Sequence, residues 1–498
     1  MNLYDDQQKH PAGRGRWVFS LALGLGLAAT LALGLQVARG APAAVPPDPY
    51  LVKDIYSGTT SSSPAGVPLN VNGKLFFRAT DEDHGEELWR SDGTEAGTLL
   101  VKDIYSGTTG SSPGGLINLR GALIFKADDG VHGDELWRSD GTEAGTLLVK
   151  DIYSGTTGPS LCHAGALGNR PVGNGVLYFQ ADDGVHGGEL WRSDGTEAGT
   201  LLVKDIYSGT NSSSPGDFFY AAGALYFSAY DGVHGWELWR SDGTEAGTLL
   251  VKDIYSGTNS SWPDHFAYAD GALYFSAYDG VHGYELWRSD GTEAGTLLVK
   301  DIYSGTNSSS PGNFFYAAGA LYFSAADGVH GDELWRSDGA EAGTLLVKDI
   351  YSGTNSSSPS YLAYTDGALH FSAADGVHGR ELWRSDGTEA GTLLVKDIYS
   401  GTTGSSPHRP IDVCGRLFFR AADGVHGEEL WMSDGTEAGT LLVEDIYSGT
   451  SSSSPAGIRR SNVNGTLFFR ADDGVHGEEL WAVFVCRRLY LPLVMKNG

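Results

Sequence analysis

A block reading ELWRSDGTEAGTLLVKDIYSGT recurs along the chain almost unchanged, and this repeat limits the possible folds more than any other feature. Its successive tryptophans are 48 residues apart, except for one spacing of 54 and one of 50. They are Trp89, Trp137, Trp191, Trp239, Trp287, Trp335, Trp383, Trp431 and Trp481. A fixed period of this size predicts a repeat architecture in which each unit buries its apolar face against its neighbours. Any asymmetric function must therefore lie where the units differ.

Each unit has the pattern of four short β-strands separated by turns. In the fifth unit, residues 271–277, 285–288 and 296–303 are apolar or β-branched runs bounded by Gly-rich and Asp-rich turns. A weaker strand at residues 313–317 opens the following unit, and no window shows a sustained helical period. Four antiparallel strands in about 40–50 residues are typical of a β-propeller blade. We name these strands a to d, with LLVKDIY as strand d.

The two ends of the repeat region predict a closed ring. Residues 50–56 form a lone d strand before the first unit, and the last unit ends at Trp481 without one. The first strand can therefore complete the last blade and remove the exposed sheet edges. The expected fold is all-β, a closed propeller of nine four-stranded blades. The alternatives are a smaller ring with spare repeats, an open β-solenoid, or a ring whose last d position is filled by residues 487–494.

The sequence divides into four predicted segments. Residues 1–40 have the pattern of an export signal, because Arg14 and Arg16 precede an apolar stretch at residues 17–35 and small residues follow. The stretch is long for a signal peptide, so an uncleaved membrane anchor is the alternative. We therefore expect a secreted or cell-surface protein. The remaining segments are a linker at 41–49, the repeat propeller at 50–484 and a C-terminal tail at 485–498.

The charge and the cysteines exclude several classes of function. The net charge of −28 disfavours binding to nucleic acid or to an anionic membrane surface, so membrane contact is expected only through an uncleaved N-terminal segment. Cys162, Cys414 and Cys486 lie outside the repeat and match no metal-binding motif. An odd number leaves at least one thiol free or paired with another molecule. Disulfides are therefore not the framework of this fold, although one could form.

The block at residues 285–292, followed by Gly295 and Thr296, resembles the ELWxxDGT repeat family of bacterial exported proteins. The match covers all nine units over residues 50–481, although Ala340 replaces Thr in the sixth unit and the ninth keeps only ELW. The resemblance implies a propeller-like exported repeat protein. No general activity follows from it, because the family is defined by the repeat itself.

The residues that recur in every unit are interpreted as structural. The Asp-Gly of the SDGT turn is explained by turn geometry alone. The Asp-Gly-Val-His-Gly loop places one histidine in each unit, and residues spread around a ring cannot converge on one metal ion as zinc ligands do. Each histidine is therefore expected to make a local hydrogen bond. The tryptophan and the Lys-Asp pair of strand d are expected to pack and hydrogen-bond between blades.

Calcium is the one cofactor that the sequence suggests, as a structural ion. Hard oxygen ligands occur near a turn in two units, although neither matches the twelve-residue calcium loop. The candidates are Asp182, Asp183, Glu189, Asp472 and Asp473.

The units differ most in the d–a and b–c loops, which share one face if the strands run from a to d outward. Aromatic residues occur in these loops only around units four and five. They are Tyr230, Trp236, Trp262, Tyr278 and Tyr284. Such a cluster predicts one exposed patch that contacts sugar or protein. The alternative is surface drift after a recent duplication.

No catalytic motif is present: the chain has no nucleophile elbow, phosphate loop or HExxH sequence. Paired carboxylates occur in every unit, but near-identical surroundings would not separate their pKa values. We therefore predict a non-enzymatic binding or scaffold propeller that recognises a glycan or an extracellular protein through the variable loop face. The alternative is a polysaccharide hydrolase or lyase, which would need unlike acidic and basic residues converging in one or two blades.

Overall fold

The computed structural model describes residues 45–155, 158, 172–459 and 461–486, within a compact unit that begins at Ala44. Every regular element in these ranges is a β-strand. This part of the chain accordingly contains no helix that could cross a membrane. The predicted export signal at 1–40, the loop that holds Cys162 and the segment 487–498 lie outside the described residues.

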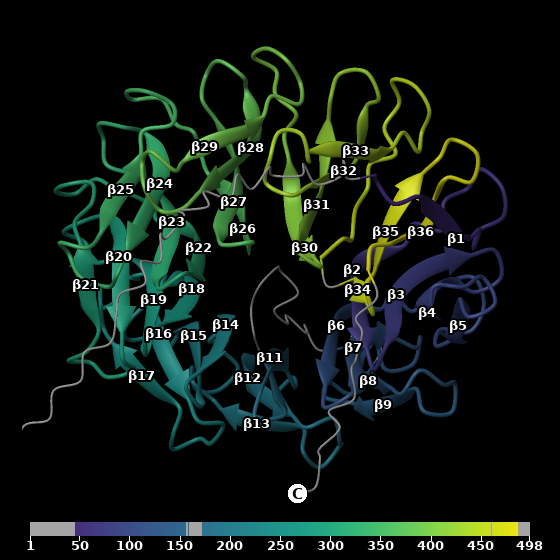
Figure 1. The fold of residues 1–498 in the computed structure, drawn as a ribbon. Helices are drawn as coiled ribbons and strands as arrows, with labels where there is room; N and C mark the ends of the chain where they lie inside the picture. The colour runs from purple at the N-terminus through teal and green to yellow at the C-terminus, as the bar shows by residue number, and fades with distance from the viewer. Residues whose placement is uncertain (1–44, 156–157, 159–171, 460, 487–498) are drawn as a thin grey trace, which may run out of the picture. The chain divides into compact units, whose positions relative to one another are not determined.

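The strands form nine four-stranded antiparallel sheets, which are the blades of a ring (Figure 1). We number the blades one to nine in chain order. Strands a lie innermost and strands d outermost (Figure 1). The predicted nine-bladed propeller is therefore confirmed.

The strand bounds repeat closely from blade to blade. Strands a are β2 Ala65–Val71, β6 Gly114–Leu119, β10 Val172–Gly173, β14 Gly216–Ala221, β18 Asp264–Ala269, β22 Gly312–Ala317, β26 Ser360–Thr365, β30 His408–Val413 and β34 Asn462–Val463. Strands b are β3 Lys74–Asp81, β7 Ala122–Asp128, β11 Val176–Asp182, β15 Ala224–Tyr230, β19 Ala272–Tyr278, β23 Ala320–Ala326, β27 Ala368–Ala374, β31 Arg416–Ala422 and β35 Thr466–Asp472. Strands c are β4 Gly85–Ser91, β8 Asp134–Ser139, β12 Gly188–Ser193, β16 Trp236–Ser241, β20 Tyr284–Ser289, β24 Asp332–Ser337, β28 Arg380–Ser385, β32 Glu428–Ser433 and β36 Glu478–Phe484. Strands d are β5 Leu99–Lys102, β9 Leu147–Lys150, β13 Leu201–Lys204, β17 Leu249–Lys252, β21 Leu297–Lys300, β25 Leu345–Lys348, β29 Leu393–Lys396, β33 Leu441–Glu444 and, for blade nine, β1 Pro49–Lys53.

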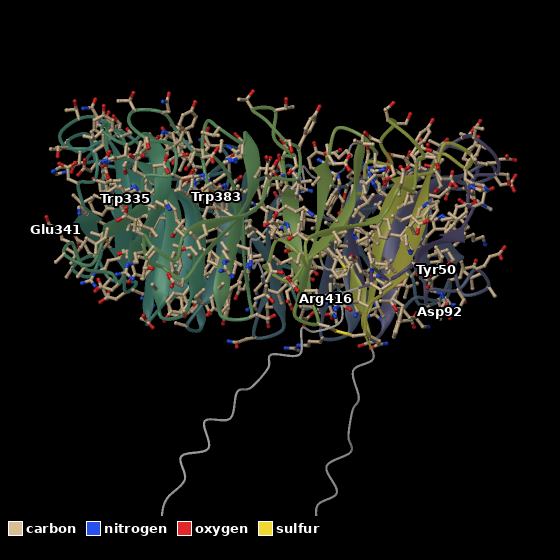
Figure 2. The ribbon with its side chains drawn as sticks, turned by 45° about the horizontal axis from the view of Figure 1, so that its top comes forward. Tyr50, Asp92, Trp335, Glu341, Trp383 and Arg416 are labelled. Atoms are coloured by element: carbon tan, nitrogen blue, oxygen red, sulfur yellow. A yellow bond between two sulfur atoms is a disulfide. The ribbon has the colours of Figure 1, made fainter. Side chains whose placement is uncertain are left out.

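The first strand closes the ring. Strand β1 pairs antiparallel with β36, with Leu51 opposite Trp481, so it supplies strand d of blade nine. The hydroxyl of Tyr50 donates to the Gly93 carbonyl in the next blade, beside Asp92 (Figure 2). Because β1 occupies this position, the alternative in which residues 487–494 fill it is wrong.

A disulfide joins the last two blades. Cys414, in the a–b turn of blade eight, bonds to Cys486 just after β36, with a Cα–Cα distance of 6.5 Å. The bond is visible beside Arg416 (Figure 2). The sequence analysis had left this pairing open.

The hydrophobic core lies between blades. Tyr226, Leu238 and Ile254 of blade four pack against Phe275 and Trp287 of blade five. Both faces of each sheet are therefore covered, which explains why the strands look apolar without a clean alternation. Equivalent clusters lie at the other blade interfaces, with other residues in place of Tyr226 in some blades, such as Phe76 in blade one and His370 in blade seven.

The lysine of strand d links its blade to the next in eight of the blades, as predicted, whereas blade eight has Glu444 at this position. The Lys300 ammonium donates to the Thr344 carbonyl at 2.8 Å and lies 5.8 Å from the ring centroid of Trp335. The neighbouring aspartate behaves differently, because Asp301 accepts from the Gly305 N–H of its own loop at 3.1 Å. The expected inter-blade role was therefore right for the lysine and wrong for the aspartate.

A buried glutamate ends strand d earlier than expected. The sequence predicted a strand through Tyr303, but β21 ends at Lys300. The fully buried Glu285 carboxylate accepts from the N–H groups of Ile302 and Tyr303 at 2.9 and 3.3 Å, and from the Ser309 hydroxyl at 2.6 Å. These bonds turn the chain away from the strand ladder. Burial raises the pKa of Glu285, and the hydrogen bonds offset part of that rise.

The two conserved turns of the repeat are held by local hydrogen bonds. In the SDGT turn, Asp290 Oδ1 accepts from the Thr292 N–H and hydroxyl at 2.9 and 2.6 Å. In the Asp-Gly-Val-His-Gly loop, His282 Nδ1 lies 2.7 Å from Asp279 Oδ2. The equivalent His-Asp contact occurs in all nine blades. The local hydrogen bond expected for each loop histidine is thus confirmed.

Candidate functional site

The d–a and b–c loops share one face of the ring. The Trp262 N–H, in the loop before β18, donates to the Trp236 carbonyl at 3.2 Å, and the Tyr278 N–H donates to the Ser261 carbonyl at 2.9 Å. The loop that enters blade five is therefore bonded to the b–c ends of blades four and five. This arrangement confirms the predicted common face and places the variable positions together.

The five aromatic residues form two groups on this face. Trp236 and Trp262 stack with ring centroids 5.0 Å apart and an interplanar angle of 17°, and Tyr230 lies 6.3 Å from Trp236. Tyr278 and Tyr284 form the second group, at 5.3 Å. Trp262 is 49% exposed, and the other four are partly buried. We call these five residues the aromatic patch; among the described ring contacts, none joins its two groups, which are linked by the Ser261–Trp262 backbone.

Two further tyrosines pack against the tyrosines of the patch. Tyr207 contacts Tyr230 edge to face at 5.3 Å, and Tyr255 contacts Tyr278 in the same way at 5.3 Å. Both are the tyrosine of the DIY sequence, which every unit contains, so sequence reasoning had no basis for singling them out. Each reaches from the preceding blade, and the patch therefore rests on the blade interfaces.

Trp262 adopts a backbone conformation that is unfavourable for a large side chain. Its φ of 48° lies in the left-handed region, which costs a bulky L-residue about 1–2 kcal/mol. The other described blades carry serine at this position, also with positive φ. These serines are Ser63, Ser112, Ser214, Ser310, Ser358, Ser406 and Ser454. The tryptophan is therefore not required by the loop geometry.

A second set of variable residues lies on the innermost strands. Each sits at a β-bulge near the start of strand a and has a φ between 52° and 56°: Asp217, His265, Asn313, Tyr361 and Arg409. Blades two and nine have Gly115 and Gly457 at this position. These positions were not predicted from the sequence. The two residues after the loop proline vary from unit to unit, and this variation could have drawn attention to these positions. The β-bulge that gives them a positive φ cannot be seen in the sequence.

Several of these bulge residues contact the next blade. The His265 ring lies 6.4 Å from that of Phe314. The Asn313 amide donates to the Pro359 carbonyl at 3.2 Å, and the Tyr361 hydroxyl lies 2.6 Å from His408 Nε2. The variable side chains therefore run from blade five to blade eight along the inner wall of the ring.

The residue before ELW forms an ion pair with strand b in four of the blades. In blades one, two, eight and nine it is acidic and pairs with a basic residue of strand b. These pairs are Arg78–Glu86 at 3.2 Å, Lys126–Asp134 at 2.9 Å, Arg420–Glu428 at 3.0 Å and Arg470–Glu478 at 3.4 Å. In blades four to seven the strand-b residue is serine: Ser228, Ser276, Ser324 and Ser372. Blades four to seven therefore lack this self-neutralising pair, and the aromatic patch lies among them.

The calcium candidates are engaged in their own loops. Asp182 and Asp472 each accept from a glycine N–H at 2.7 Å. Asp183 and Asp473 each accept from two N–H groups and contact the loop histidine. Glu189 is buried and accepts hydrogen bonds from the Ile206 N–H, just after strand d, and from the Ser213 hydroxyl. In the described ranges, no three His, Cys, Asp or Glu side chains are grouped to hold a metal ion. Calcium binding here remains a prediction.

Comparisons with known proteins extend to the fold only. No protein-family model matches the chain, and no curated protein matches its sequence. Among solved structures, the computationally designed Ika8 protein is 14% identical, with a TM-score of 0.41 over 75% of this chain and 96% of that one. A puromycin hydrolase is 14% identical, with a TM-score of 0.34 over 72% of this chain and 59% of that one. Sqt1 of Saccharomyces cerevisiae is 10% identical, with a TM-score of 0.38 over 75% and 95%.

Proposed function

We propose that this chain is a secreted or cell-surface binding propeller that recognises a glycan through the aromatic patch and carries out no chemistry of its own. The observation that carries the proposal is Trp262. It is half exposed, it stacks on Trp236, and it takes the place of a serine at a strained backbone position. An exposed indole kept at such a position is explained by contact with a ligand.

A glycan fits this surface better than a purely apolar partner. Flat aromatic faces stack on the apolar faces of sugar rings, and the Trp262 side chain is 49% exposed. A polar acceptor, the Asp264 carboxylate, lies beside the patch. Burial raises the pKa of the Tyr284 hydroxyl, and the nearby charge of Asp264 raises it further. Carboxylate oxygens next to an aromatic platform can accept hydrogen bonds from sugar hydroxyls.

The test is binding of residues 41–498 to a glycan and polysaccharide array, with calcium and with EDTA. The variant Trp262→Ser restores the residue of the other blades, so it is expected to fold. The control is Phe484→Ser, which removes an exposed aromatic at the end of β36, outside the patch. We expect Trp262→Ser to lose binding while Phe484→Ser keeps it.

Three other outcomes would contradict parts of the proposal. Equal binding by Trp262→Ser and wild type would exclude the patch as the site. Absence of binding to every glycan would favour a protein partner or a scaffold role. Release of reducing or unsaturated sugar ends would favour the hydrolase or lyase alternative. Loss of binding in EDTA would instead support calcium at sites such as Asp183 and Asp473.

We further propose that residues 1–40 direct export and are removed, as in the ELWxxDGT repeat proteins that the chain resembles. Expression of the full chain in a bacterium, followed by mass spectrometry of the exported protein, should show Ala41 as the first residue. A protein that retains residues 1–40 and sediments with membranes would indicate the anchor instead.

A further inference from the structure

A group of basic side chains lies on blade eight of this strongly acidic protein. Arg409 lies on β30, the innermost strand of the blade, and Arg420 lies on β31 (Figure 1). Both are close to His408, as is Arg459 in the loop toward blade nine. Burial and these three arginines lower the pKa of His408 to about 4, so the imidazole is neutral at pH 7. Positive charge is therefore concentrated around a neutral ring.

Arg409 has no acidic partner among the described residues. Arg420 forms an ion pair with Glu428 at 3.0 Å. No described residue forms an ion pair or a hydrogen bond with the Arg409 guanidinium, and the side chain is partly exposed. A guanidinium presents N–H donors in a fork that matches carboxylate, sulfate or phosphate oxygens. Arg409 is thus available to an anion from solution.

The fold does not require an arginine at this position. Arg409 has a φ of 52°, in the left-handed region, and the same bulge carries Gly115 in blade two and Gly457 in blade nine. Glycine adopts this conformation without the steric penalty that arginine pays. A residue other than glycine in such an unfavourable backbone conformation is typical of functional positions.

The neighbouring side chains hold the group in place. The Tyr361 hydroxyl lies 2.6 Å from His408 Nε2, and the two ring centroids are 4.2 Å apart. Strand pairing sets His408 directly opposite Arg420. The His408 imidazole is therefore a fixed, neutral neighbour of the arginines. It would gain a positive charge only near its pKa of about 4.

We propose that Arg409 and Arg420, supported by His408 and Tyr361, form a binding site for a single oxyanion group, a carboxylate or a sulfate ester, carried by a saccharide. The surrounding protein is acidic overall, with a net charge of −28, so an isolated anionic group is accepted more readily than a densely charged polymer. This site lies on blade eight, apart from the aromatic patch of blades four and five. The choice of a saccharide as the carrier rests on the glycan function proposed above, whereas the anion-binding group itself does not.

The test measures binding of residues 41–498 to three oligosaccharides by calorimetry at low ionic strength. Trigalacturonate presents carboxylates, a κ-carrageenan tetrasaccharide presents sulfate esters, and maltotriose is the neutral control. We expect one or both anionic oligosaccharides to bind, to bind more weakly as NaCl is raised to 150 mM, and maltotriose not to bind at the same site. Which anion binds identifies the source of the oxyanion.

The deciding variant is Arg409→Gly, because glycine occupies this bulge in two other blades. We expect its affinity for the anion to fall about tenfold or more, as expected for loss of a charge-assisted hydrogen bond. Its melting temperature should be no lower than that of the wild type. The matched control Asn313→Gly, at the same bulge in blade six, should bind the anion within about twofold of the wild type.

Failure of this site can be told apart from failure of the aromatic patch. Trp262→Ser should leave anion binding unchanged. The proposal is overturned if neither anionic oligosaccharide binds, if maltotriose binds equally well, or if Arg409→Gly binds like the wild type while remaining folded.

Discussion

The raised pKa values of the buried glutamates predict that stability falls as pH rises. In blade four, the fully buried Glu237 carboxylate accepts from the N–H groups of Ile254, Tyr255 and Ser261 at 3.0, 3.3 and 3.1 Å, and from the Ser261 hydroxyl at 2.6 Å. Burial is the larger influence and raises the pKa of Glu237 to about 7, against these hydrogen bonds. Most carboxylates that accept several hydrogen bonds have a lowered pKa instead.

The sign of the effect follows from proton linkage. The reference pKa of a glutamate is 4.5, and that of folded Glu237 is about 7. Between these values the unfolded chain has released the proton and the folded chain has kept it, so the free energy of unfolding falls as pH rises. A pKa difference of about 2.5 corresponds to roughly 3 kcal/mol for this one residue. The contribution is fully present below pH 4.5 and is lost by pH 7.

The perturbation is Glu237→Gln, which removes the ionisation but keeps the shape. Its urea-unfolding free energy should be compared with that of the wild type at pH 5 and at pH 8. At pH 5 the variant should be less stable, because its amide cannot accept all the bonds of the carboxyl. At pH 8 the difference should shift by roughly 3 kcal/mol in favour of the variant.

The control is Glu245→Gln, an exposed glutamate in the SDGT turn region of the same blade, which should show no such shift. The same stability difference between Glu237→Gln and wild type at both pH values would contradict a raised pKa of Glu237. A shift of the opposite sign would also contradict it, and would mean that the four hydrogen bonds outweigh burial.

Three further predictions concern the joints between blades. Replacing Lys300 with Met removes its hydrogen bond to Thr344 and its contact with Trp335. This should lower the free energy of unfolding, measured in a urea titration, by about 1–2 kcal/mol. An unchanged unfolding midpoint would contradict the inter-blade role of Lys300. Replacing Cys414 with Ser opens a link across 72 residues to Cys486 and should destabilise the protein by up to about 4 kcal/mol, with the same loss on reduction of the wild type. Removing β1 exposes the edge of β36 and should produce concentration-dependent association in sedimentation, whereas a stable monomer would show that ring closure does not need this strand.

The architecture could be predicted from the sequence because the repeat shows both how many blades there are and how the ring closes. The period of the tryptophans gives the number of blades, and the unpaired strand at residues 50–56 gives the closure with β36. The end of strand d could not be predicted. Glu285 looks like an ordinary strand residue, and only its burial beside Ile302 shows why the chain leaves the ladder.

The candidate site could be predicted only in part. Aromatic residues at variable loop positions pointed to the patch, since nearness in a blade follows from the repeat. The φ of Trp262 and the bulge at Arg409 depend on backbone geometry that no local pattern encodes. That the Arg409 guanidinium has no partner among the described residues depends further on which acidic residues lie nearby, and this is set by the packing of blades seven to nine.

The claim that binding occurs at the aromatic patch is tested most directly with 5-fluorotryptophan and 19F NMR. The chain has 12 tryptophans, and Trp17 is absent from residues 41–498, which leaves the nine core indoles of the ELW motif and the two of the patch. The probes are chitohexaose, cellohexaose, laminarihexaose and mannohexaose, added separately. At least one of them should move the signals of Trp236 and Trp262, assigned with the Trp262→Ser variant, while the nine core signals stay in place. Movement of core signals without these two, or no movement with any of the four, would contradict the assignment of the patch as a glycan site.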